Sequence, residues 1–503
     1  MTQTAIIIGL PETCRRLVKQ LELLPRPLVV LGWVLPTDAA TRPGASGRLR
    51  RRVGRVFGSP PRTVDPPAGT PLLGGIEELE AIVERGRPDL ALVTLPAVMN
   101  DLIVSVRTRL RRLGLPDRFM PTLEDQIAGV GPRSRSEIDL TRLLDRDPRA
   151  IDEAAARGVI EGNRVLITGA GGSIGSELAR LAARYEPREL ILIDRSENAL
   201  FEIDRQIARR HPDLERRALL HDVVDAEGTL QQFDRFRPGI VFHAAAHKHV
   251  PIMEEHPALA VDNNLFGTKS VADAADAVGA RRVVIISTDK AVNPSSIMGA
   301  TKRLAELYVQ HLNERSATGF AMVRFGNVLG STGSVLDVWS KEIAEGGPLT
   351  VTDPNMTRFF MTLPEAAALV IQSASLLDPA APCGEIFVLD MGKPIRVLDL
   401  ARRFIALHGL DPAVSGGGEP LVDIVFTGPR PGEKLHEELA LSSEELRPTS
   451  HPEIRLCRPA APEADFVRRM ISVLSPDRRN REATAVAATV RRLASTPMQP
   501  AAA

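Results

Sequence analysis

The sequence predicts an α/β protein in which two doubly wound parallel sheets follow each other along the chain, with a smaller lobe after the second. Three observations predict this fold. Apolar, strand-like runs alternate with helix-like segments along most of the 503 residues, a pattern typical of parallel sheets. A glycine-rich turn separates one strand from the next helix at residues 169–175. A weaker strand–helix alternation precedes it, within residues 1–137.

Residues 1–137 predict a degenerate Rossmann-like domain. A buried strand at 4–9 (TAIIIG) precedes a helix-like stretch and a second apolar run. Residues 37–72 are rich in Pro, Gly and Arg and predict a loop or a partly disordered insertion. The first strand ends in GLPETC rather than G-x-G-x-x-G, so the backbone cannot easily approach a pyrophosphate there. We expect a structural or assembly role for this domain; nucleotide binding is the alternative.

Residues 138–160 predict a linker, after which stronger signals define a second domain over 161–460. Its strands are expected in RVLIT, ELILID, IVFHAAA, RRVVIIS and FAMVRFG. The pattern becomes less regular after about Gly326, where we expect the smaller lobe. Residues 461–503 predict a C-terminal helix and a frayed tail.

The composition limits the class of protein. Hydrophobic residues make up 44% and charged residues 25% of the chain, which is ordinary for a globular domain. The 63 basic and 63 acidic residues balance, so bulk charge predicts no nucleic-acid partner. Cys14, Cys383 and Cys457 are far apart, which favours a reducing compartment. With no signal peptide and no apolar run near the roughly 20 residues of a membrane helix, we expect a cytoplasmic protein without an integral membrane segment.

The turn at 169–175 reads GAGGSIG and has the spacing of a dinucleotide-binding loop. Gly169 permits the tight turn, Gly172 the approach of backbone to phosphate, and Gly175 close helix packing. The N-terminus of the following helix would face the pyrophosphate. A strand before, a helix after and an acid about twenty residues later make the pattern specific. The predicted cofactor-binding residues are Gly169, Gly171, Gly172, Ser173, Ile174, Gly175, Asp194, Arg195, Asp222, Val223, Ala244, Ala245, Ala246 and Lys302.

The residues after the next two strands bear on which cofactor binds. Asp194 ends a strand and suits the ribose hydroxyls of NAD, whereas Arg195 beside it could hold the 2′-phosphate of NADP. We favour NAD, with NADP as the alternative. Asp222 is placed for the adenine edge, or caps a loop. The nearby histidines predict no metal site, because no carboxylate or Cys completes a usual ligand set; they are His243, His247, His249 and His256.

The stretch STDKAVNPSSIMGATKR has the layout of an active site in which a Tyr lies four residues before a Lys. Lys302 is present, but the position four residues earlier is Met298, whose thioether cannot transfer a proton. The neighbouring Thr288, Asp289 and Lys290 offer an acid and a base side by side. Only eight of the 63 basic residues are Lys. Since Lys can act as a base and Arg cannot, this bias favours functional roles for Lys290 and Lys302.

Six motifs together resemble the extended short-chain dehydrogenase/reductases of bacterial polysaccharide biosynthesis: GAGGSIGSEL, HAAAHKHVPIMEEHP, STDKAVNPSSIMGATKR, VRFGNVLGSTGSV, MTRFFMT and RPGEKLHEEL. These are nucleotide-sugar dehydratases typified by UDP-N-acetylglucosamine 4,6-dehydratase, and the likeness covers roughly residues 138–455. It implies an extended Rossmann fold with a smaller substrate lobe, bound NAD, a UDP-sugar substrate and a homo-oligomer. Long members of the family carry a similar N-terminal unit, usually after transmembrane helices, which we do not expect here.

The resemblance implies a role for each residue of the active-site stretch. Asp289 would be the acid and Lys290 the base at sugar C5. Lys302 would orient the nicotinamide ribose and lower the pKa of the C4 hydroxyl, which Thr288 would bond. Members with Met in the position of Met298 resemble the dehydratases that retain the configuration at C5. The group that takes the C4 hydroxyl proton is left open; Thr288 with a water is one route.

Further residues are expected to bind the substrate. Asn327 follows a strand and suits a contact with the sugar diphosphate. The resemblance places Arg358, Arg430 and Glu433 near the UDP end and Lys248 near the active site. The planar fork of Arg bonds two phosphate oxygens, although an ordinary surface Arg is the alternative in a chain so rich in Arg.

The expected reaction converts UDP-N-acetylglucosamine to a UDP-4-keto-6-deoxy-N-acetylhexosamine. It proceeds by oxidation at C4, elimination of water across C5–C6 and return of hydride to C6. A 4-epimerase or a C5-inverting dehydratase is the first alternative, and Met298 argues against the epimerase, which usually relies on the Tyr base. A non-catalytic NAD-binding scaffold is the second, and the intact run from Thr288 to Lys290 argues against it.

Overall fold

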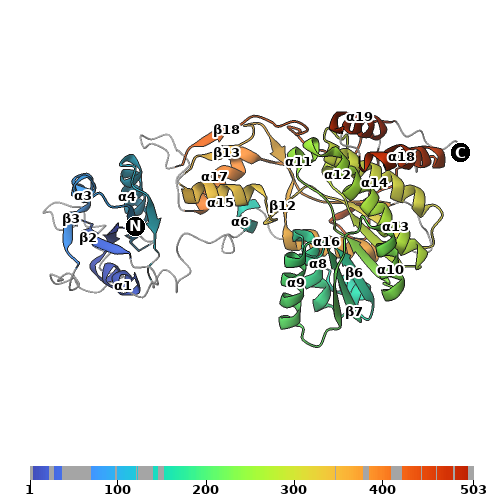
Figure 1. Cartoon of the computed structure of the whole chain (residues 1–503), viewed down its shortest axis with the longest axis horizontal. Coiled ribbons are helices and arrows are strands. Elements are labelled where there is room, and N and C mark those ends of the chain that lie inside the picture. Colours follow the sequence, from blue (N-terminus) through green and yellow to red (C-terminus); the bar gives the residue numbers. More distant parts are fainter. Residues whose placement is uncertain are drawn as a thin grey trace. The chain divides into compact units, whose positions relative to one another are not determined.

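The computed structural model divides into two compact units. Unit 1 comprises Met1–Ile138 with Phe404–Asp423, and unit 2 comprises Asp139–Arg403 with Ile424–Ala503 (Figure 1). Most of the predicted insertion at 37–72, Cys383 and the predicted frayed tail lie outside the described residues. The described residues are 4–21, 28–36, 70–96, 99–120, 122, 140–144, 152–345, 347–377, 385–408, 422–442, 444–459, 462–479 and 482–496.

Unit 1 is built on a five-stranded sheet in the order β3-β2-β1-β4-β5, with every neighbouring pair parallel. Successive side chains of the central strand β1 pack into two separate cores, because they point to opposite faces of the sheet. The strands are β1 (Thr4–Gly9), β2 (Val29–Leu35), β3 (Leu72–Gly75), β4 (Leu90–Thr94) and β5 (Asp117–Phe119). The helices are α1 (Pro11–Leu21), the 3-10 turn η1 (Ile76–Glu78), α3 (Leu79–Gly86) and α4 (Asn100–Arg112).

The end of β1 in unit 1 is closed by side chains. The hydroxyl of Thr13 donates to the carbonyl of Thr94, at 2.7 Å, across the point where the strand order reverses. A Cβ added at Gly9 would lie 2.4 Å from that same carbonyl oxygen. A dinucleotide in an open α/β sheet lies at this switch point, and here Thr13 occupies the space in front of β1.

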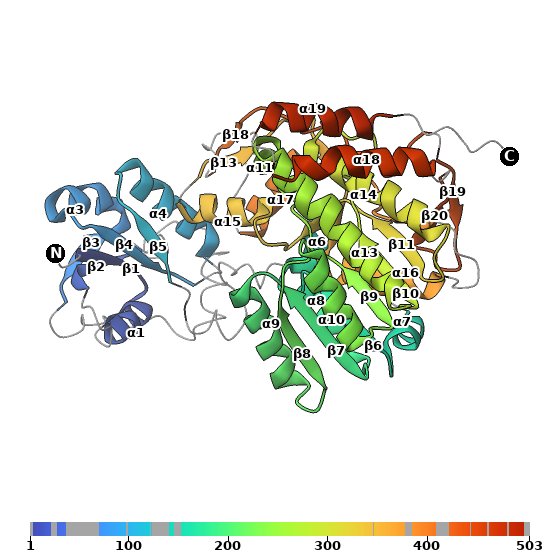
Figure 2. The same ribbon diagram turned by 45° about the vertical axis from the view of Figure 1, so that its right-hand side comes forward.

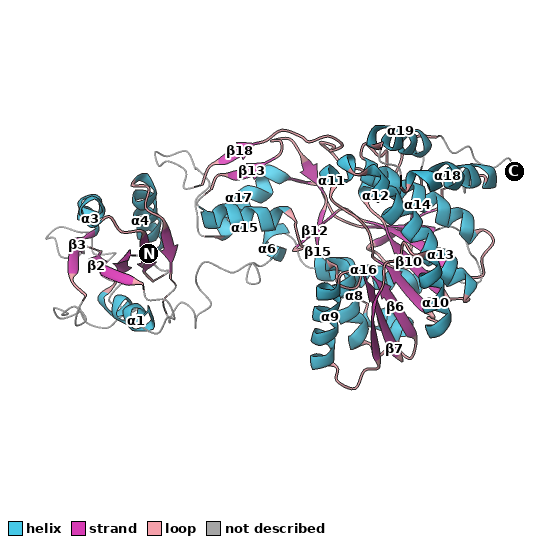
Figure 3. Ribbon diagram, viewed as in Figure 1, coloured by secondary structure: helices cyan, strands magenta, loops and turns pink. Residues whose placement is uncertain are grey.

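Unit 2 is built on a nine-stranded sheet in the order β19-β20-β16-β11-β10-β9-β6-β7-β8. Its strands run parallel from β16 to β8, and β20 and β19 add an antiparallel edge. Figure 3 shows strands of this sheet, among them β6, β7 and β10, in magenta with helices in cyan around them. The predicted doubly wound fold is thereby confirmed. The strands are β6 (Arg164–Thr168), β7 (Glu189–Asp194), β8 (Arg216–Leu220), β9 (Ile240–His243), β10 (Arg282–Ile286), β11 (Gly319–Arg324), β16 (Glu385–Leu389), β19 (Leu446–Pro448) and β20 (Ile454–Cys457).

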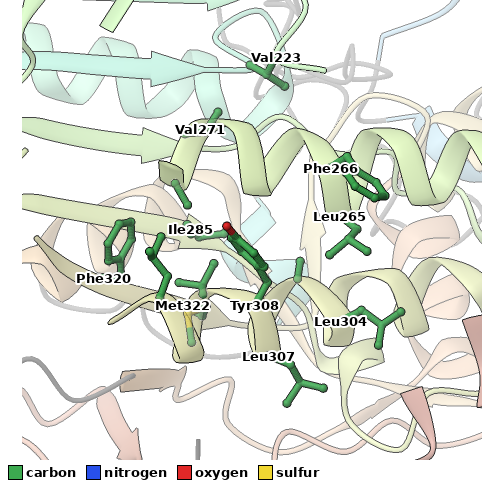
Figure 4. Close-up of a cluster of buried hydrophobic side chains, with 14 of the residues drawn as sticks. Val223, Leu265, Phe266, Val271, Ile285, Leu304, Leu307, Tyr308, Phe320 and Met322 are labelled. Carbon is green, nitrogen blue, oxygen red and sulfur yellow. The ribbon is translucent and has the colours of Figure 1, made fainter. Parts of the chain in front are cut away.

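Helices cover both faces of this sheet. One core joins it to α10, α13 and α14, with α18 and α19 outside them (Figure 2), and a second core joins it to α7, α8, α9 and α16. Figure 4 shows the first core around Tyr308. The helices are α7 (Glu153–Ile160), α8 (Ser173–Arg184), α9 (Glu197–Arg210), α10 (Ala226–Phe236), α11 (Val250–Glu255), α12 (Pro257–Ala260), the π-helix η4 (Val261–Phe266), α13 (Gly267–Ala277), α14 (Ile297–Asn313), α16 (Leu363–Leu376), α18 (Ala464–Asp477) and α19 (Ala483–Ala494).

The smaller lobe of unit 2 consists of three two-stranded ladders with helices between them. The pairs are β12 (Asn327–Leu329) with β15 (Phe360–Thr362), β13 (Leu349–Val351) with β18 (Ile424–Phe426), and β14 (Thr357–Arg358) with β17 (Ile395–Arg396). Helices α15 (Val335–Glu345) and α17 (Val397–Leu407) lie between these strands along the chain, and the residues of α17 from Phe404 onward are assigned to unit 1. Asn327 of β12 and Arg358 of β14 line a pocket that is described below.

Two predicted segments differ in detail from the structure. The stretch predicted as a linker holds the helices α6 (Leu140–Leu144) and α7, and α7 packs against α16 as part of unit 2. Its apolar residues Ala156, Val159 and Ile160 are buried, which explains the packing. The C-terminal region holds two helices rather than one. Within the part of the chain that the structure describes, no helix is long and apolar enough to cross a membrane.

Each unit contains one buried tryptophan. Trp33 lies on β2 of unit 1, is 3% exposed, and donates through its indole Nε1 to the carbonyl of Thr70 at 2.8 Å. Trp339 lies on α15 of unit 2, is fully buried, and donates to the carbonyl of Thr350 at 2.8 Å. Both indoles thus combine an apolar body in the core with a satisfied donor.

A buried network of charges connects helix α14 to the strand β11. Glu306 accepts two hydrogen bonds from Arg324, at 2.8 and 2.7 Å, and one from Ser287 at 2.7 Å. Arg303 adds a further contact to Glu306 at 3.1 Å, and Arg324 also donates to Glu444 at 2.7 Å. Burial opposes ionisation of Glu306, but the two arginines and Ser287 outweigh it and lower its pKa to about 2. The network therefore ties the end of β10, the strand β11 and α14 together.

Candidate active site

The glycine loop after β6 is held in a conformation that excludes side chains. Gly169 has a φ of 65°, and a Cβ there would lie 2.6 Å from the backbone nitrogen of Ala245. A Cβ at Gly171 would lie 2.5 Å from that of Ala199, and one at Gly175 only 2.0 Å from the carbonyl oxygen of Gly169. The loop thus leaves a backbone-lined cradle at the N-terminus of α8, which fits a pyrophosphate.

Replacing Gly175 with Ala should abolish cofactor retention and destabilise the protein. The new methyl group would press on backbone atoms, and overpacking of this kind costs about 1–3 kcal/mol. Gly158→Ala is the matched control, since nothing lies within 4 Å of its added Cβ on α7. We expect the control to keep its cofactor and to melt slightly higher. Thermal melts with and without NAD would check both, and a Gly175→Ala protein that gains wild-type stability from NAD would contradict the cradle.

The end of β7 carries the carboxylate that was predicted to bind ribose. Both oxygens of Asp194 accept backbone N–H groups, from Gly171 at 2.9 Å and from Ser196 at 2.8 Å. Arg195 lies 3.6 Å from the carboxylate of Asp222 and donates to Asn263 at 3.3 Å. The two backbone donors therefore hold the carboxylate of Asp194 in place. The guanidinium of Arg195 is already paired with the side chains of Asp222 and Asn263.

One pocket joins most of the predicted cofactor residues. Gly169, Gly172, Asp194, Arg195, Asp222, Val223 and Ala244–Ala246 line it. Ile193, His221 and Asn263 line it as well and were not predicted. Asn263 lies on the π-helix η4, far away in sequence, so no local pattern signals it. His221 directly precedes the predicted Asp222, and that adjacency was the available signal.

The carboxyl end of β10 brings the predicted acid and base together. Asp289 is fully buried and its backbone N–H donates to the carbonyl of Phe325 at 3.1 Å, which continues the pairing of β10 with β11. The carboxylate oxygen Oδ1 of Asp289 accepts from the Thr288 hydroxyl and from the Lys290 ammonium, both at 2.9 Å. Within the described residues its other oxygen, Oδ2, has no hydrogen-bond partner. Acid, base and hydroxyl thus form one connected group.

Lys290 is surrounded by acceptors. Its ammonium lies 2.9 Å from Asp289 and 3.6 Å from Glu437, and it donates to the side-chain oxygen of Asn327 at 3.2 Å. Burial alone would lower the pKa of Lys290, but the charges of Asp289 and Glu437 outweigh it, so the pKa is raised above the ordinary value. The resting side chain is therefore an ammonium at neutral pH.

Met298 and Lys302 lie on α14, one turn apart. Met298 is 4% exposed and packs in the apolar core, where its thioether has no proton to give. Lys302 is also 4% exposed; burial lowers its pKa to about 8, and Glu306 limits that shift. Neither residue is among those lining the two pockets. Tyr308 cannot replace a catalytic Tyr, because its hydroxyl donates to Asp273 within the core at 2.5 Å.

A second pocket joins all of the predicted substrate residues to Lys290. Its wall includes Lys248, Asn327, Arg358, Arg430 and Glu433. Five cationic and two acidic side chains line it, so its field suits an anionic ligand. Further lining residues were not predicted: His249, Val250, Pro251, Ser295, Ser296, Gly432, Lys434 and Glu437.

The two predicted phosphate ligands differ in how their guanidinium groups are used. Arg358 is 6% exposed and donates to the carbonyls of Thr357, Leu435 and Lys434, at 2.8, 3.0 and 2.7 Å. It therefore holds the loop that carries Lys434. Arg430 is largely exposed and pairs with Glu433 at 2.7 Å, so its fork remains at the pocket mouth.

No cluster of His, Cys, Asp or Glu among the described residues could hold a metal ion. The histidines near the cofactor pocket are used otherwise. His243 bridges the hydroxyls of Thr168 and Thr268, at 2.7 and 3.0 Å. Burial and the nearby charge of Lys302 lower its pKa to about 3, so it is a neutral structural residue.

The sequence of this chain is similar to those of several known proteins. A capsular polysaccharide biosynthesis protein of Staphylococcus aureus, CapD, is 42% identical over 378 residues, which is 75% of this chain and 61% of that protein. The chain thus spans less than two thirds of that relative's length. A UDP-N-acetylglucosamine 4,6-dehydratase (inverting) of Campylobacter jejuni is 34% identical over 289 residues, covering 56% of this chain and 78% of the relative.

The X-ray structure of Pen from Bacillus thuringiensis is similar in fold, with a TM-score of 0.51 and 32% identity, over 59% of this chain and 87% of that one. A family model described as polysaccharide biosynthesis protein matches residues 165–459. That range contains the glycine loop, the run from Thr288 to Lys290 and both pockets. The chain belongs to the polysaccharide biosynthesis protein family.

Proposed function

We propose that this protein is a nucleotide-sugar 4,6-dehydratase that acts on UDP-N-acetylglucosamine and retains the configuration at C5. The observation that carries the proposal is the contact, at 2.9 Å, between the buried Asp289 and Lys290, which lines a cationic pocket. Dehydration requires an acid and a base that reach neighbouring carbons, and this pair supplies them. The relative from Campylobacter jejuni, named for the same substrate, supports the choice of sugar.

NAD is the cofactor that the residues of the first pocket fit. The glycine cradle would hold its pyrophosphate, and Asp194 would accept from its ribose hydroxyls while repelling a 2′-phosphate. When bound, NAD would supply the hydride chemistry at C4 and C6 of the sugar.

Thr288, Asp289 and Lys290 can carry the proton transfers of the reaction once Lys290 has lost the proton that it holds at rest. The hydroxyl of Thr288 donates to Asp289, so it can pass the C4 hydroxyl proton to that carboxylate. The carboxylic acid so formed then protonates the departing C6 hydroxyl, which leaves as water. Lys290, as the neutral amine, takes the proton from C5, which the C4 ketone has made acidic. The proton that left C4 therefore departs in the water, and no Tyr is needed.

Lys290 also supports retention at C5. One amine that removes the C5 proton and returns it works on a single face of the sugar. Inversion would require a second proton donor on the opposite face. The carboxylates that contact Lys290 are those of Asp289 and Glu437. The stereochemistry of the product distinguishes this proposal from a C5-inverting dehydratase.

Mass spectrometry of UDP-N-acetylglucosamine incubated with the protein and NAD tests the function. A product lighter by one water, with its C5 configuration read by NMR, would support a retaining dehydratase. An isobaric product with shifted retention would mean epimerisation and would overturn the proposal. If the sugar is unchanged while NAD stabilises the protein, a panel of UDP-, GDP- and dTDP-sugars separates another substrate from a scaffold, and UDP-N-acetylglucosamine is then wrong.

A further inference from the structure

Residues 330–334 contact the borders of both pockets, and the reaction above gives them no role. They join β12 of the smaller lobe to helix α15. Gly330 and Gly333 have φ values of 81° and 69°, in the left-handed region that favours glycine. The chain therefore turns sharply on either side of Thr332, and the peptide groups of Thr332 are presented to the two pockets.

The first contact is with the glycine loop of the first pocket. The backbone N–H of Thr332 donates to the hydroxyl oxygen of Ser173 at 2.9 Å, and the two hydroxyl oxygens lie 3.4 Å apart. Ser173 is the first residue of α8 and directly follows Gly172, which lines the first pocket. Thr332 is therefore attached to the glycine loop at the helix N-terminus, where a pyrophosphate would bind.

The second contact is with the wall of the second pocket. The ammonium of Lys248 donates to the carbonyl of Thr332 at 2.8 Å. A Cβ added at Gly333 would lie 3.2 Å from the ring carbon Cε1 of His249. Lys248 and His249 both line the second pocket. Because an ammonium has three donors, Lys248 can hold this carbonyl and still donate to an anionic ligand. Thr332 is thus tied to one pocket through its N–H and to the other through its carbonyl.

We propose that residues 330–334 form a wall shared by both pockets, so that UDP in the second pocket tightens the binding of NAD in the first. Thr332 and Lys248 are exposed, so ordering them costs conformational entropy. A diphosphate held by Lys248 would order this side chain and, through the carbonyl of Thr332, the wall beside Ser173. NAD would then bind to a wall that is already ordered, which gives positive coupling. Ser173 and Lys248 are positioning residues in this inference, which rests on the proposed binding of NAD and a UDP-sugar.

Calorimetric titration of the whole protein with NAD, alone and with saturating UDP, tests the coupling. UDP is the probe because it carries the diphosphate but no sugar that could react. Coupling between two sites commonly changes affinity by about 5- to 150-fold, so UDP should lower the dissociation constant of NAD about fivefold or more. NAD should lower the dissociation constant of UDP by the same factor, because coupling between two binding equilibria is reciprocal. An unchanged or a raised dissociation constant for NAD would overturn the inference.

Two variants break the wall on opposite sides of Thr332. Ser173→Ala removes the acceptor of the Thr332 N–H and should reduce the coupling factor to about one. If Ser173 were only a direct ligand of NAD, the variant would weaken NAD equally with and without UDP, and the factor would keep its wild-type value. Lys248→Met removes the donor to the Thr332 carbonyl and should abolish the coupling even when UDP is raised to saturation. A wild-type factor in either variant would exclude the shared wall.

Ser340→Ala and Lys393→Met are the matched controls. Ser340 donates to the carbonyl of Leu336 within α15 at 2.7 Å, Lys393 is exposed, and neither lines either pocket. Both controls should keep the wild-type coupling factor, and its loss in either would overturn the inference. NAD and UDP that bind without coupling would contradict the shared wall alone. Failure of NAD or UDP to bind at all would contradict the proposed function as well, so the two failures are distinguishable.

Discussion

Lys290→Arg should abolish dehydration while leaving the binding of NAD intact. Arg keeps the positive charge beside Asp289 and Glu437, but its guanidinium does not deprotonate and cannot take the C5 proton. General base catalysis contributes about 100- to 10,000-fold, so turnover should fall by that amount. Formation of the keto sugar by mass spectrometry and the stabilisation of the protein by NAD would be measured together.

Lys290→Arg removes the base but keeps the positive charge of the ion pair, whereas Lys290→Ala removes both. Removal of the whole side chain would leave Asp289 and Glu437 buried without a counter-ion, so a loss of activity in Lys290→Ala has two explanations. Lys269→Arg is a suitable control, because Lys269 pairs with Asp273 on α13 and neither residue lines either pocket. Wild-type turnover in Lys290→Arg would exclude Lys290 as the C5 base.

Glu306→Gln should cost about 3–5 kcal/mol of the free energy of unfolding of unit 2, because it leaves Arg324 buried with one carboxylate fewer. Arg324 is fully buried, and Glu306 accepts two of its hydrogen bonds. Denaturant titration would measure the loss. Glu202→Gln is the control; this residue pairs with Arg205 at an exposed site, where such pairs contribute about 0–1 kcal/mol. A loss for Glu306→Gln no larger than that of the control would contradict the role of the network.

The pH dependence of the same variant gives an independent check. Folding lowers the pKa of Glu306 from its ordinary value of 4.5 to about 2, so the folded state binds this proton less readily than the unfolded state. The stability it contributes is therefore complete above about pH 4.5 and is lost as the pH falls towards about 2. We expect the difference between wild type and Glu306→Gln to be constant at neutral pH and to shrink over that interval.

The sequence predicted the parts of the site that lie on one strand or one turn. Asp289 and Lys290 are adjacent, and the glycines of the cofactor loop follow a strand directly, so their meeting in space requires no knowledge of the fold. Asn327 lies on β12, Arg358 on β14 and Glu433 after β18, and all three line the same pocket. Family motifs identified them, whereas composition did not.

The sequence could not predict how the side chains are engaged. Arg358 was expected to meet phosphate, yet it donates to the carbonyls of Lys434 and Leu435 and to that of its neighbour Thr357. Glu437 has nothing in its local pattern that distinguishes it from Glu438, and only the fold buries one and exposes the other. The helices within the predicted linker were missed for a similar reason, since α7 is eight residues long and its burial comes from contact with α16.

Trp33 lies in unit 1 and Trp339 in unit 2, so tryptophan fluorescence can report on each unit separately. The sequence has two tryptophans, so replacing either with Phe leaves a single emitter inside one unit. Fluorescence of each single-tryptophan protein then follows the melting of that unit alone. A multi-unit chain cannot be assumed to unfold in one step. With these two signals, the free energy that Glu306 contributes can be assigned to unit 2 without cutting the chain.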